Sequence, residues 1–171
     1  MSFRDGRLVT SKLRRGGDGS DDPKSGGKPS HDKKRILFLC TGNSCRSQMA
    51  EGWARHLHGE VVEAYSAGTA PHGVDPRTVQ VMAESGVDVS SHTSNNVGEY
   101  VGIPFDLVIT VCHSARESCP VFSGGKKTVH RFFDDPPSLA READREEEAL
   151  VPYRRVRDEI RDFVTHITDL L

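Results

Sequence analysis

Short apolar runs, separated by polar and glycine-containing segments, follow one another from about residue 35 to the end of the chain. Ile36–Cys40 and Asp106–Val111 are apolar on both faces, which is typical of central strands in a parallel sheet covered on both sides. Val61–Ala67 and Thr128–Phe132 predict two further strands. The hydrophobic pattern therefore predicts four strands spread along the chain.

Segments with helical spacing of apolar residues alternate with these strands. Ser47–His58 repeats apolar residues every three or four positions. Asp75 and Pro76 suit the cap and the first position of a second helix, which Gly86 would end. Tyr153–Leu171 predicts a closing helix with one apolar face. Together these elements predict a single α/β domain with a four-stranded parallel sheet flanked by helices.

The first 34 residues lack this pattern and have the glycine- and serine-rich composition of a linker. Residues 1–35 carry ten Lys or Arg against five Asp, whereas residues 36–171 carry thirteen Lys or Arg against twenty Asp or Glu. We predict a disordered basic tail at 1–34 and a folded domain at 35–171. A solubilising tail is favoured over a nucleic-acid-binding one, because Phe3 is its only aromatic residue.

No apolar run approaches the ~20 residues needed to cross a bilayer. The chain also begins without the apolar core of a secretory signal. We therefore expect a cytoplasmic monomer with no membrane or nucleic-acid partner, in which thiols stay reduced. Cysteines in that compartment indicate catalysis or metal binding before structural disulfides.

The most informative motif follows the first predicted strand, where Cys40 is separated by five residues from Arg46 and Ser47 begins a helix. Backbone amides of such a loop can surround a tetrahedral anion, and the helix adds its positive end. Arg46 can bind two anion oxygens, and the same positive field favours a nucleophilic thiolate at Cys40. Ser47 can bond to that sulfur. The predicted oxyanion-binding residues are Thr41, Gly42, Asn43, Ser44, Cys45 and Arg46.

The four cysteines are not equivalent. Cys40 could be only a small buried residue at a strand end, but the loop context favours a nucleophile. Cys45 lies inside the loop and is interpreted as a bystander thiol. Cys112 ends the third predicted strand, so a parallel sheet can place it beside Cys40, and with Cys119 it could store two electrons as a disulfide. The pattern indicates an enzyme that attacks an oxyanion and then reduces it.

The segment from Cys40 to Gly52 closely resembles the active-site segment of thioredoxin-coupled arsenate reductases, which share the low-molecular-weight tyrosine phosphatase fold. The resemblance extends from about Lys34 to the C-terminus. It includes Tyr65-Ser66-Ala67-Gly68, His72-Gly73-Val74, His92-Thr93-Ser94, Cys112 with Cys119, Phe133-Asp134-Asp135-Pro136 and Arg155-Val156-Arg157-Asp158-Glu159-Ile160.

The resemblance implies a role for each matching residue. Cys40 would form a covalent adduct with arsenate, Arg46 would hold its oxygens, and Asp135 would be the general acid. Cys112 would attack Cys40 and release arsenite, and Cys119 would attack Cys112 to leave a disulfide for thioredoxin to reduce. If residues 112–119 were helical, the two cysteines would be about 10.5 Å apart along the axis. A disulfide requires a shorter distance between the two Cα atoms. The segment between the cysteines must therefore rearrange on oxidation.

The resemblance also implies a potassium site near the loop. Asn43, Glu51 and Ser66 match it, but Asn95 stands where the family usually has Asp. The missing charge predicts weak or absent potassium binding, so we expect no tightly bound cofactor.

Other classes of protein remain open at this point. A phosphatase could use Arg46 and Asp135 equally well, although Pro136 is followed by Pro137-Ser138-Leu139 rather than by aromatic residues, and it has no use for Cys112 and Cys119. The cysteine spacing is poor for a compact zinc module. A silent oxyanion sensor is a further alternative.

Overall fold

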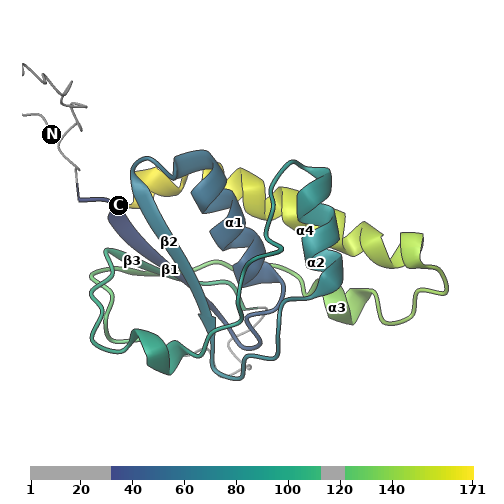
Figure 1. The fold of residues 1–171 in the computed structure, drawn as a ribbon, viewed down its shortest axis with the longest axis horizontal. Helices are drawn as coiled ribbons and strands as arrows, with labels where there is room; N and C mark the ends of the chain where they lie inside the picture. The colour runs from purple at the N-terminus through teal and green to yellow at the C-terminus, as the bar shows by residue number, and fades with distance from the viewer. Residues whose placement is uncertain (1–31, 113–121) are drawn as a thin grey trace, which may run out of the picture. The chain divides into compact units, whose positions relative to one another are not determined.

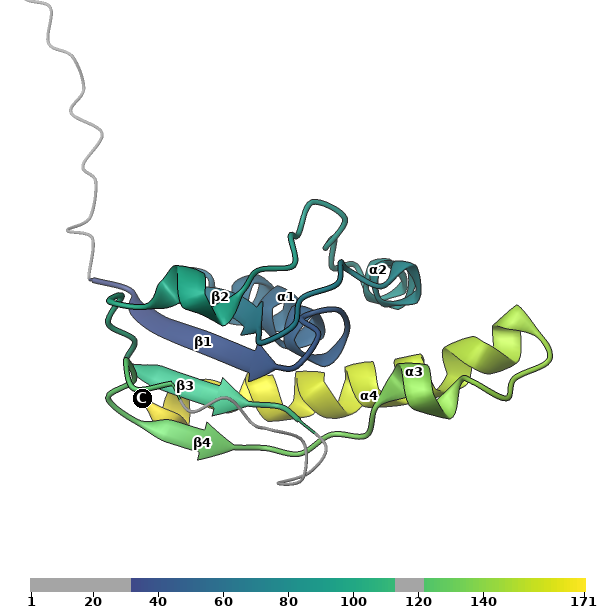
Figure 2. The ribbon, with the colours of Figure 1, turned by 90° about the horizontal axis from the view of Figure 1, so that it is seen from below.

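The computed structural model describes residues 32–112 and 122–171. Four strands form one parallel sheet in the order β2-β1-β3-β4 (Figures 1 and 2). They are β1 (Lys34–Cys40), β2 (Val62–Gly68), β3 (Leu107–Thr110) and β4 (Thr128–His130). Cys40 pairs with Gly68 and Leu39 pairs with Thr110, so the carboxyl ends of three strands meet at one edge. The parallel four-stranded sheet is confirmed.

The α-helices cover one face of this sheet, and a smaller, largely aromatic layer that includes residues of a 3-10 helix covers the other. The helices are α1 (Arg46–His58), α2 (Pro76–Glu84), α3 (Pro136–Leu139) and α4 (Glu146–Thr165), with 3-10 helices η1 (Val97–Tyr100) and η2 (Ile167–Leu170). Ile36 and Phe38 pack in one core cluster with residues of α1 and α4, whereas Leu37 and Leu39 pack with Phe105. Successive β1 side chains point to opposite faces, so both faces of the strand are buried, as its unbroken apolar run predicts.

The start and end of α2 follow the predicted capping chemistry. The Asp75 carboxylate accepts a hydrogen bond from the Arg77 amide at 2.8 Å, and Pro76 occupies the first turn. Gly86 has φ of +78°, a left-handed conformation that favours glycine after a helix.

The last helix differs from its prediction. It begins at Glu146 rather than Tyr153 and ends at Thr165, after which η2 completes the chain. Pro152 lies inside α4, and because proline usually interrupts a helix, the sequence pattern predicts a start only after it. Three glutamates fill the first turn, where the helix dipole favours negative charge.

Two smaller differences concern β4 and α3. Strand β4 ends at His130 rather than Phe132, because its partner β3 ends at Thr110. The sequence reading did not predict α3, which begins directly after Asp135. This helix begins with two consecutive prolines, Pro136 and Pro137, which suit a first turn.

The predicted tail lies almost wholly outside the described residues, which begin at Asp32, and strand β1 already starts at Lys34. Residues 113–121, which include Cys119 and the segment expected to rearrange, also lie outside them. Within the described ranges, no helix has the length and apolar character needed to cross a membrane.

Candidate active site

The loop between β1 and α1 has its carbonyl groups turned outward. The carbonyl oxygens of Thr41, Gly42 and Ser44 accept hydrogen bonds from the backbone amides of Ala70, His72 and Asp75, respectively, at 2.9–3.2 Å. The Asn43 carbonyl accepts from the side chains of Gln48 and Ser94. Because the N–H and C=O of a trans peptide point in opposite directions, these bonds turn the loop amides to the other side, where the Asn43 amide donates to the Cys40 sulfur. The predicted anion-binding amides are therefore held in place from behind.

Cys40 lies at the base of this loop, with its side chain almost buried. The Asn43 amide donates to its sulfur at 3.0 Å, and the Ser47 hydroxyl lies 2.9 Å from the same sulfur. Both are donors that can stabilise negative charge on sulfur, and the N-terminus of α1 adds to them. The predicted contact between Ser47 and Cys40 is present.

Asn43 connects the loop to its surroundings. It has φ of +43°, a conformation that asparagine tolerates better than most residues. Its Nδ2 donates to Ser47 Oγ at 2.9 Å and to Ser66 Oγ at 2.8 Å, and its Oδ1 accepts from the Asn95 amide at 2.7 Å. A left-handed backbone and a fully bonded side chain fix this turn of the loop.

Arg46 faces the segment that carries the predicted general acid. Its Nη2 lies 3.0 Å from Asp135 Oδ1, and its Nη1 donates to the Phe133 carbonyl at 3.2 Å. Ser138 donates to the other Asp135 oxygen at 2.6 Å. The guanidinium is 9% exposed and the carboxylate 29%, so this ion pair lies at the boundary between the core and solvent. Residues 89 positions apart in sequence thus meet over the loop.

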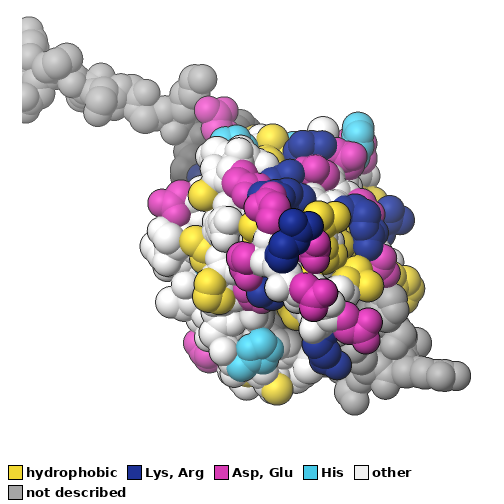
Figure 3. Space-filling model, turned by 90° about the vertical axis from the view of Figure 1, so that its right-hand side faces the viewer, with side chains coloured by type: hydrophobic (Ala, Val, Ile, Leu, Met, Phe, Trp, Pro, Cys, Tyr) yellow, Lys and Arg dark blue, Asp and Glu magenta, His cyan; other side chains and the backbone are white. Residues whose placement is uncertain are grey.

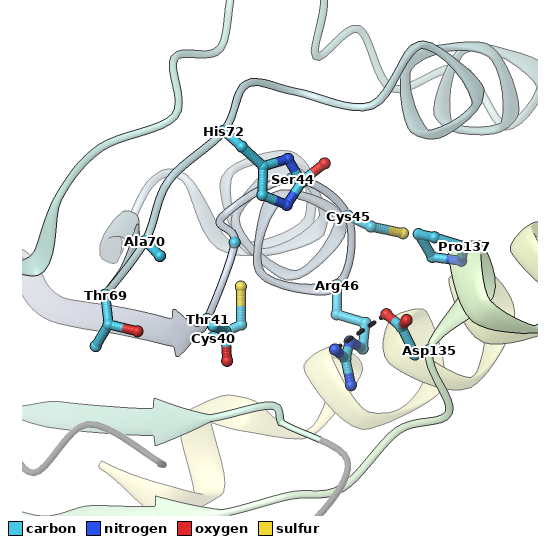
Figure 4. Close-up of a pocket in the computed structure, with 11 residues that line it drawn as sticks. Cys40, Thr41, Ser44, Cys45, Arg46, Thr69, Ala70, His72, Asp135 and Pro137 are labelled. Atoms are coloured by element: carbon cyan, nitrogen blue, oxygen red, sulfur yellow. Dashed lines mark ion pairs between the residues drawn. The ribbon is translucent and has the colours of Figure 1, made fainter. Parts of the chain in front are cut away.

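These residues line a pocket with a volume of about 590 Å³. Figure 4 shows how its lining side chains lie. Among the described residues it is lined by Cys40, Thr41, Gly42, Ser44, Cys45, Arg46, Thr69, Ala70, His72, Asp135 and Pro137. None of these has a phenyl, phenol or indole ring. His72 packs against the loop so closely that a Cβ on Gly42 would lie 2.3 Å from His72 Nε2. A side chain at this position would therefore displace the exposed His72 ring from the loop.

Cys112 follows β3 and is completely buried. Its sulfur donates to the Leu39 carbonyl at 3.9 Å, and Leu39 directly precedes Cys40 in the adjacent strand. The sheet thus places Cys112 beside the strand end that carries Cys40. Cys119 lies in the part of the chain that the structure does not describe.

Cys45 has a different environment from Cys40. It is buried beside α1, and Figure 4 shows its sulfur directed toward Pro137 rather than toward Cys40. Burial raises the pKa of this thiol far above its usual range, and Asp75 raises it further. The thiol stays protonated at neutral pH, which supports its interpretation as a bystander.

The residues proposed for potassium do come together, and one of them, Glu51, pairs with an arginine. Ser66 Oγ donates to Glu51 Oε2, and Arg55 Nη2 lies 2.6 Å from Glu51 Oε1. Burial raises the pKa of Glu51, and the Ser66 hydrogen bond and the Arg55 charge oppose that rise. The backbone amide of Asn95 donates to Asn43, and the Asn95 side chain has no carboxylate with which to bind a cation.

Several supporting residues were not predicted from the sequence. Gln48 and Ser94 hold the Asn43 carbonyl, and Asp75 holds the Ser44 carbonyl through its amide. The Asp75 carboxylate also accepts from the Tyr153 hydroxyl at 2.6 Å. Asp75 was visible only as a helix cap, and no local pattern connects it to Tyr153, 78 positions away.

The fold is parallel α/β, and its thiol lies beneath an amide-lined loop that an arginine and an aspartate face. These features define a class of proteins that hold a tetrahedral oxyanion against a cysteine. The chain belongs to the low molecular weight phosphotyrosine protein phosphatase family, whose model matches residues 35–170.

Individual relatives have names that are more specific than the family name. An arsenate reductase of Halalkalibacterium halodurans is 47% identical over 129 residues, which cover 75% of this chain and 91% of the relative. A solved arsenate reductase in a phosphate-binding state superposes with a TM-score of 0.67 at 28% identity, over 80% of this chain and 98% of the other. A low molecular weight protein tyrosine phosphatase from T. tengcongensis superposes with a TM-score of 0.61 at 26% identity, over 81% and 100%.

Proposed function

We propose that this protein reduces arsenate to arsenite, with Cys40 as the nucleophile. The observation that carries the proposal is the position of two thiols at one edge of the sheet. Cys40 lies under the loop, and the Cys112 sulfur donates to the carbonyl of Leu39, the residue before Cys40. A hydrolytic phosphatase needs only the first of these thiols. The relatives named arsenate reductase support the same conclusion.

The first step joins arsenate to the enzyme. Arsenate binds to the loop amides and to Arg46, where it displaces the Asp135 carboxylate from Nη2. The proton of the Cys40 thiol passes to the Asp135 carboxylate, and the Cys40 sulfur attacks arsenic. Asp135 then gives this proton to an arsenate hydroxyl, which leaves as water. The product is a Cys40–arsenate thioester in which arsenic is still As(V).

The next steps move two electrons. Cys112 sulfur attacks Cys40 sulfur, and the electrons of the sulfur–arsenic bond remain on arsenic, which leaves as arsenite, As(III). A Cys40–Cys112 disulfide forms at the same time. Cys119 then attacks Cys112 and frees Cys40, and the dithiol of thioredoxin reduces the resulting Cys112–Cys119 disulfide. The first transfer oxidises the sulfurs of Cys40 and Cys112 to one disulfide and reduces As(V) to As(III). The two later transfers are thiol–disulfide exchanges, so the two electrons that arsenic gains come in the end from thioredoxin.

The decisive experiment measures arsenite formation with thioredoxin, thioredoxin reductase and NADPH for the wild type and for Cys40→Ser, Cys112→Ser and Cys119→Ser. We expect no product from the first two variants. Cys119→Ser should release one arsenite per protein and then stop with a Cys40–Cys112 disulfide. Full steady-state turnover by Cys119→Ser would contradict the three-thiol sequence.

The second candidate function is hydrolysis of phosphate monoesters, which the family and the Arg46–Asp135 pair favour. The absence of large aromatic rings among the described lining residues argues against a phosphotyrosine pocket. Turnover of p-nitrophenyl phosphate, compared with arsenate on the same preparation, separates the two. A clear preference for the ester without any reductant would overturn the reductase proposal.

A further inference from the structure

A continuous chain of hydrogen bonds runs from the partly exposed Arg55 to the sulfur of Cys40. Arg55 pairs with Glu51, and Glu51 accepts from Ser66. Asn43 donates to Ser66 at 2.8 Å and to Ser47 at 2.9 Å, and Ser47 lies 2.9 Å from the Cys40 sulfur. We call this set, Arg55, Glu51, Ser66, Asn43 and Ser47, the Arg55 relay.

Glu51 is the buried charge of the Arg55 relay. Its side chain is only 7% exposed, and a buried carboxylate is costly unless it is both paired and hydrogen-bonded. Here Arg55 supplies the opposite charge and Ser66 supplies the hydrogen bond. Removing Arg55 would leave a buried carboxylate with no cation beside it in the relay.

The guanidinium is held in place rather than loosely attached. Its Nε and Nη2 both donate to the Ala64 carbonyl in β2, at 3.2 and 3.1 Å. Glu51 and Arg55 are one turn apart on α1, which packs along β2 (Figure 1). Arg55 therefore connects the helix, the strand and the buried carboxylate at one point.

The oxygens here do not fit a bound potassium ion. The Asn95 amide can only donate, so Asn43 must turn Oδ1 toward it and present its Nδ2 donor to Ser66 and Ser47. Both Glu51 oxygens already have donors, and the Asn95 side-chain oxygen accepts from Thr93 at 3.0 Å.

We propose that Arg55 is a positioning residue: its guanidinium is the fixed cation of a buried relay that orients Asn43 and Ser47 around Cys40, in place of a bound monovalent cation. The inference rests on the proposed role of Cys40 as nucleophile. It extends that role, because it names the group that holds Asn43 and Ser47 in position to donate hydrogen bonds to the Cys40 sulfur.

The test measures the rate at which iodoacetate alkylates Cys40 in the reduced protein, followed by mass spectrometry of the Cys40 peptide. Each protein is measured in KCl and in NaCl at equal ionic strength, together with its melting temperature. Because no arsenate is present, failure of this inference is distinguishable from failure of arsenate turnover.

The variants are Arg55→Gln, Arg55→Lys, Glu51→Gln and the double variant Glu51→Gln/Arg55→Gln. Arg35→Gln is the matched control, because Arg35 is also half exposed and bonds to a glutamate, Glu63, at 3.2 Å. Arg55→Lys and the double variant keep the test informative if Arg55→Gln folds poorly.

We expect wild-type alkylation and melting temperature to be the same in both salts. Arg55→Gln should slow alkylation roughly tenfold, the size expected for losing a hydrogen bond between charged groups. Arg55→Lys should recover most of that rate, and Arg35→Gln should match the wild type. In the Glu51→Gln background, Arg55→Gln should have little further effect, because the charge it balances is gone.

Three results would overturn the inference. The first is a wild-type alkylation rate or melting temperature that is higher in KCl than in NaCl, because a potassium ion would then be bound. The second is an Arg55→Gln rate equal to that of the wild type. The third is full additivity of Glu51→Gln and Arg55→Gln.

Discussion

At the scale of single residues, Asp135 has two partners and two proposed tasks. It pairs with Arg46 across the loop and accepts from Ser138, so its carboxylate occupies a donor that an oxyanion also needs. As the proposed general acid it must also deliver a proton to the leaving oxygen. These two tasks have opposite effects on binding and on turnover, which makes them separable by kinetics.

Asp135→Asn should lower kcat for arsenate by about 10²–10⁴-fold, because the amide has no acidic proton to give. KM should stay equal or fall, since the amide no longer pairs with Arg46 as a charge. Steady-state kinetics with arsenate measure both. Asp134→Asn is the control, because Asp134 pairs with Arg155 at 2.8 Å rather than with Arg46. Equal losses in the two variants would contradict the assignment.

The candidate site shows how far single residues could be predicted. The spacing of Cys40 and Arg46 after a buried strand was enough to predict the loop and the Ser47 contact to the Cys40 sulfur, because these are local features. The left-handed backbone of Asn43 and its bonds to Ser66 and Asn95 were not predictable, since they depend on segments 23 and 52 positions away.

At the scale of elements, helices α2 and α4 hold the loop from behind. The Tyr153 hydroxyl of α4 donates to Asp75 Oδ2 at 2.6 Å, and the Asp75 amide donates to the Ser44 carbonyl at 3.0 Å. Tyr153 is almost completely buried, so its hydroxyl depends on this bond. The position of α4 is therefore transmitted to the loop through Asp75.

Tyr153→Phe should lower the free energy of unfolding by about 1–2 kcal/mol, because it removes one hydrogen bond to a carboxylate. KM for arsenate should rise, because the Ser44 carbonyl is held less firmly. Urea unfolding and steady-state kinetics measure the two effects. In the Asp75→Asn background the same change should cost less, and an equal cost would show that Tyr153 does not act through Asp75.

The two helices are also joined by ion pairs, and Figure 3 shows basic and acidic side chains intermixed on the face that it views. Arg154 of α4 bonds to Glu84 of α2 at 2.8 Å. This hydrogen bond holds the pKa of Glu84 below its usual range. A carboxylate whose pKa is lowered on folding stabilises the protein above its unfolded pKa and loses that effect as the pH falls.

Glu84→Gln should therefore destabilise the protein by no more than about 1 kcal/mol at neutral pH, because both partners are partly exposed. The difference from wild type should vanish as the pH falls through the lowered pKa of Glu84. Urea unfolding over a series of pH values measures it, with Glu60→Gln at an exposed position as the control. A difference that persists at acid pH would exclude the ion pair as its cause.

At the scale of the whole molecule, stability depends on covering both faces of the sheet. Phe105 is the centre of the aromatic layer, with its ring 5.6, 6.0 and 5.7 Å from those of Tyr65, Tyr100 and Phe122. It is fully buried against Leu37 and Leu39 of β1. This layer protects the face of the sheet opposite α1 and α4.

Phe105→Ala should lower the free energy of unfolding by about 3–5 kcal/mol, through lost burial and the cavity left behind. Urea unfolding measures this, and Val101→Ala is the control, because Val101 is 76% exposed and should change stability by less than about 0.5 kcal/mol. Similar small losses in both variants would mean that the aromatic layer contributes little to stability.

By itself, the sequence determined the parallel sheet and the place of the loop between Cys40 and Arg46, because strand burial, helix caps and loop spacing are properties of short segments. The tertiary structure alone decided which distant groups meet: Asp135 with Arg46, Tyr153 with Asp75, and the Arg55 relay with Cys40. Those contacts depend on how α1, α2 and α4 pack on the sheet, and no local pattern encodes that packing.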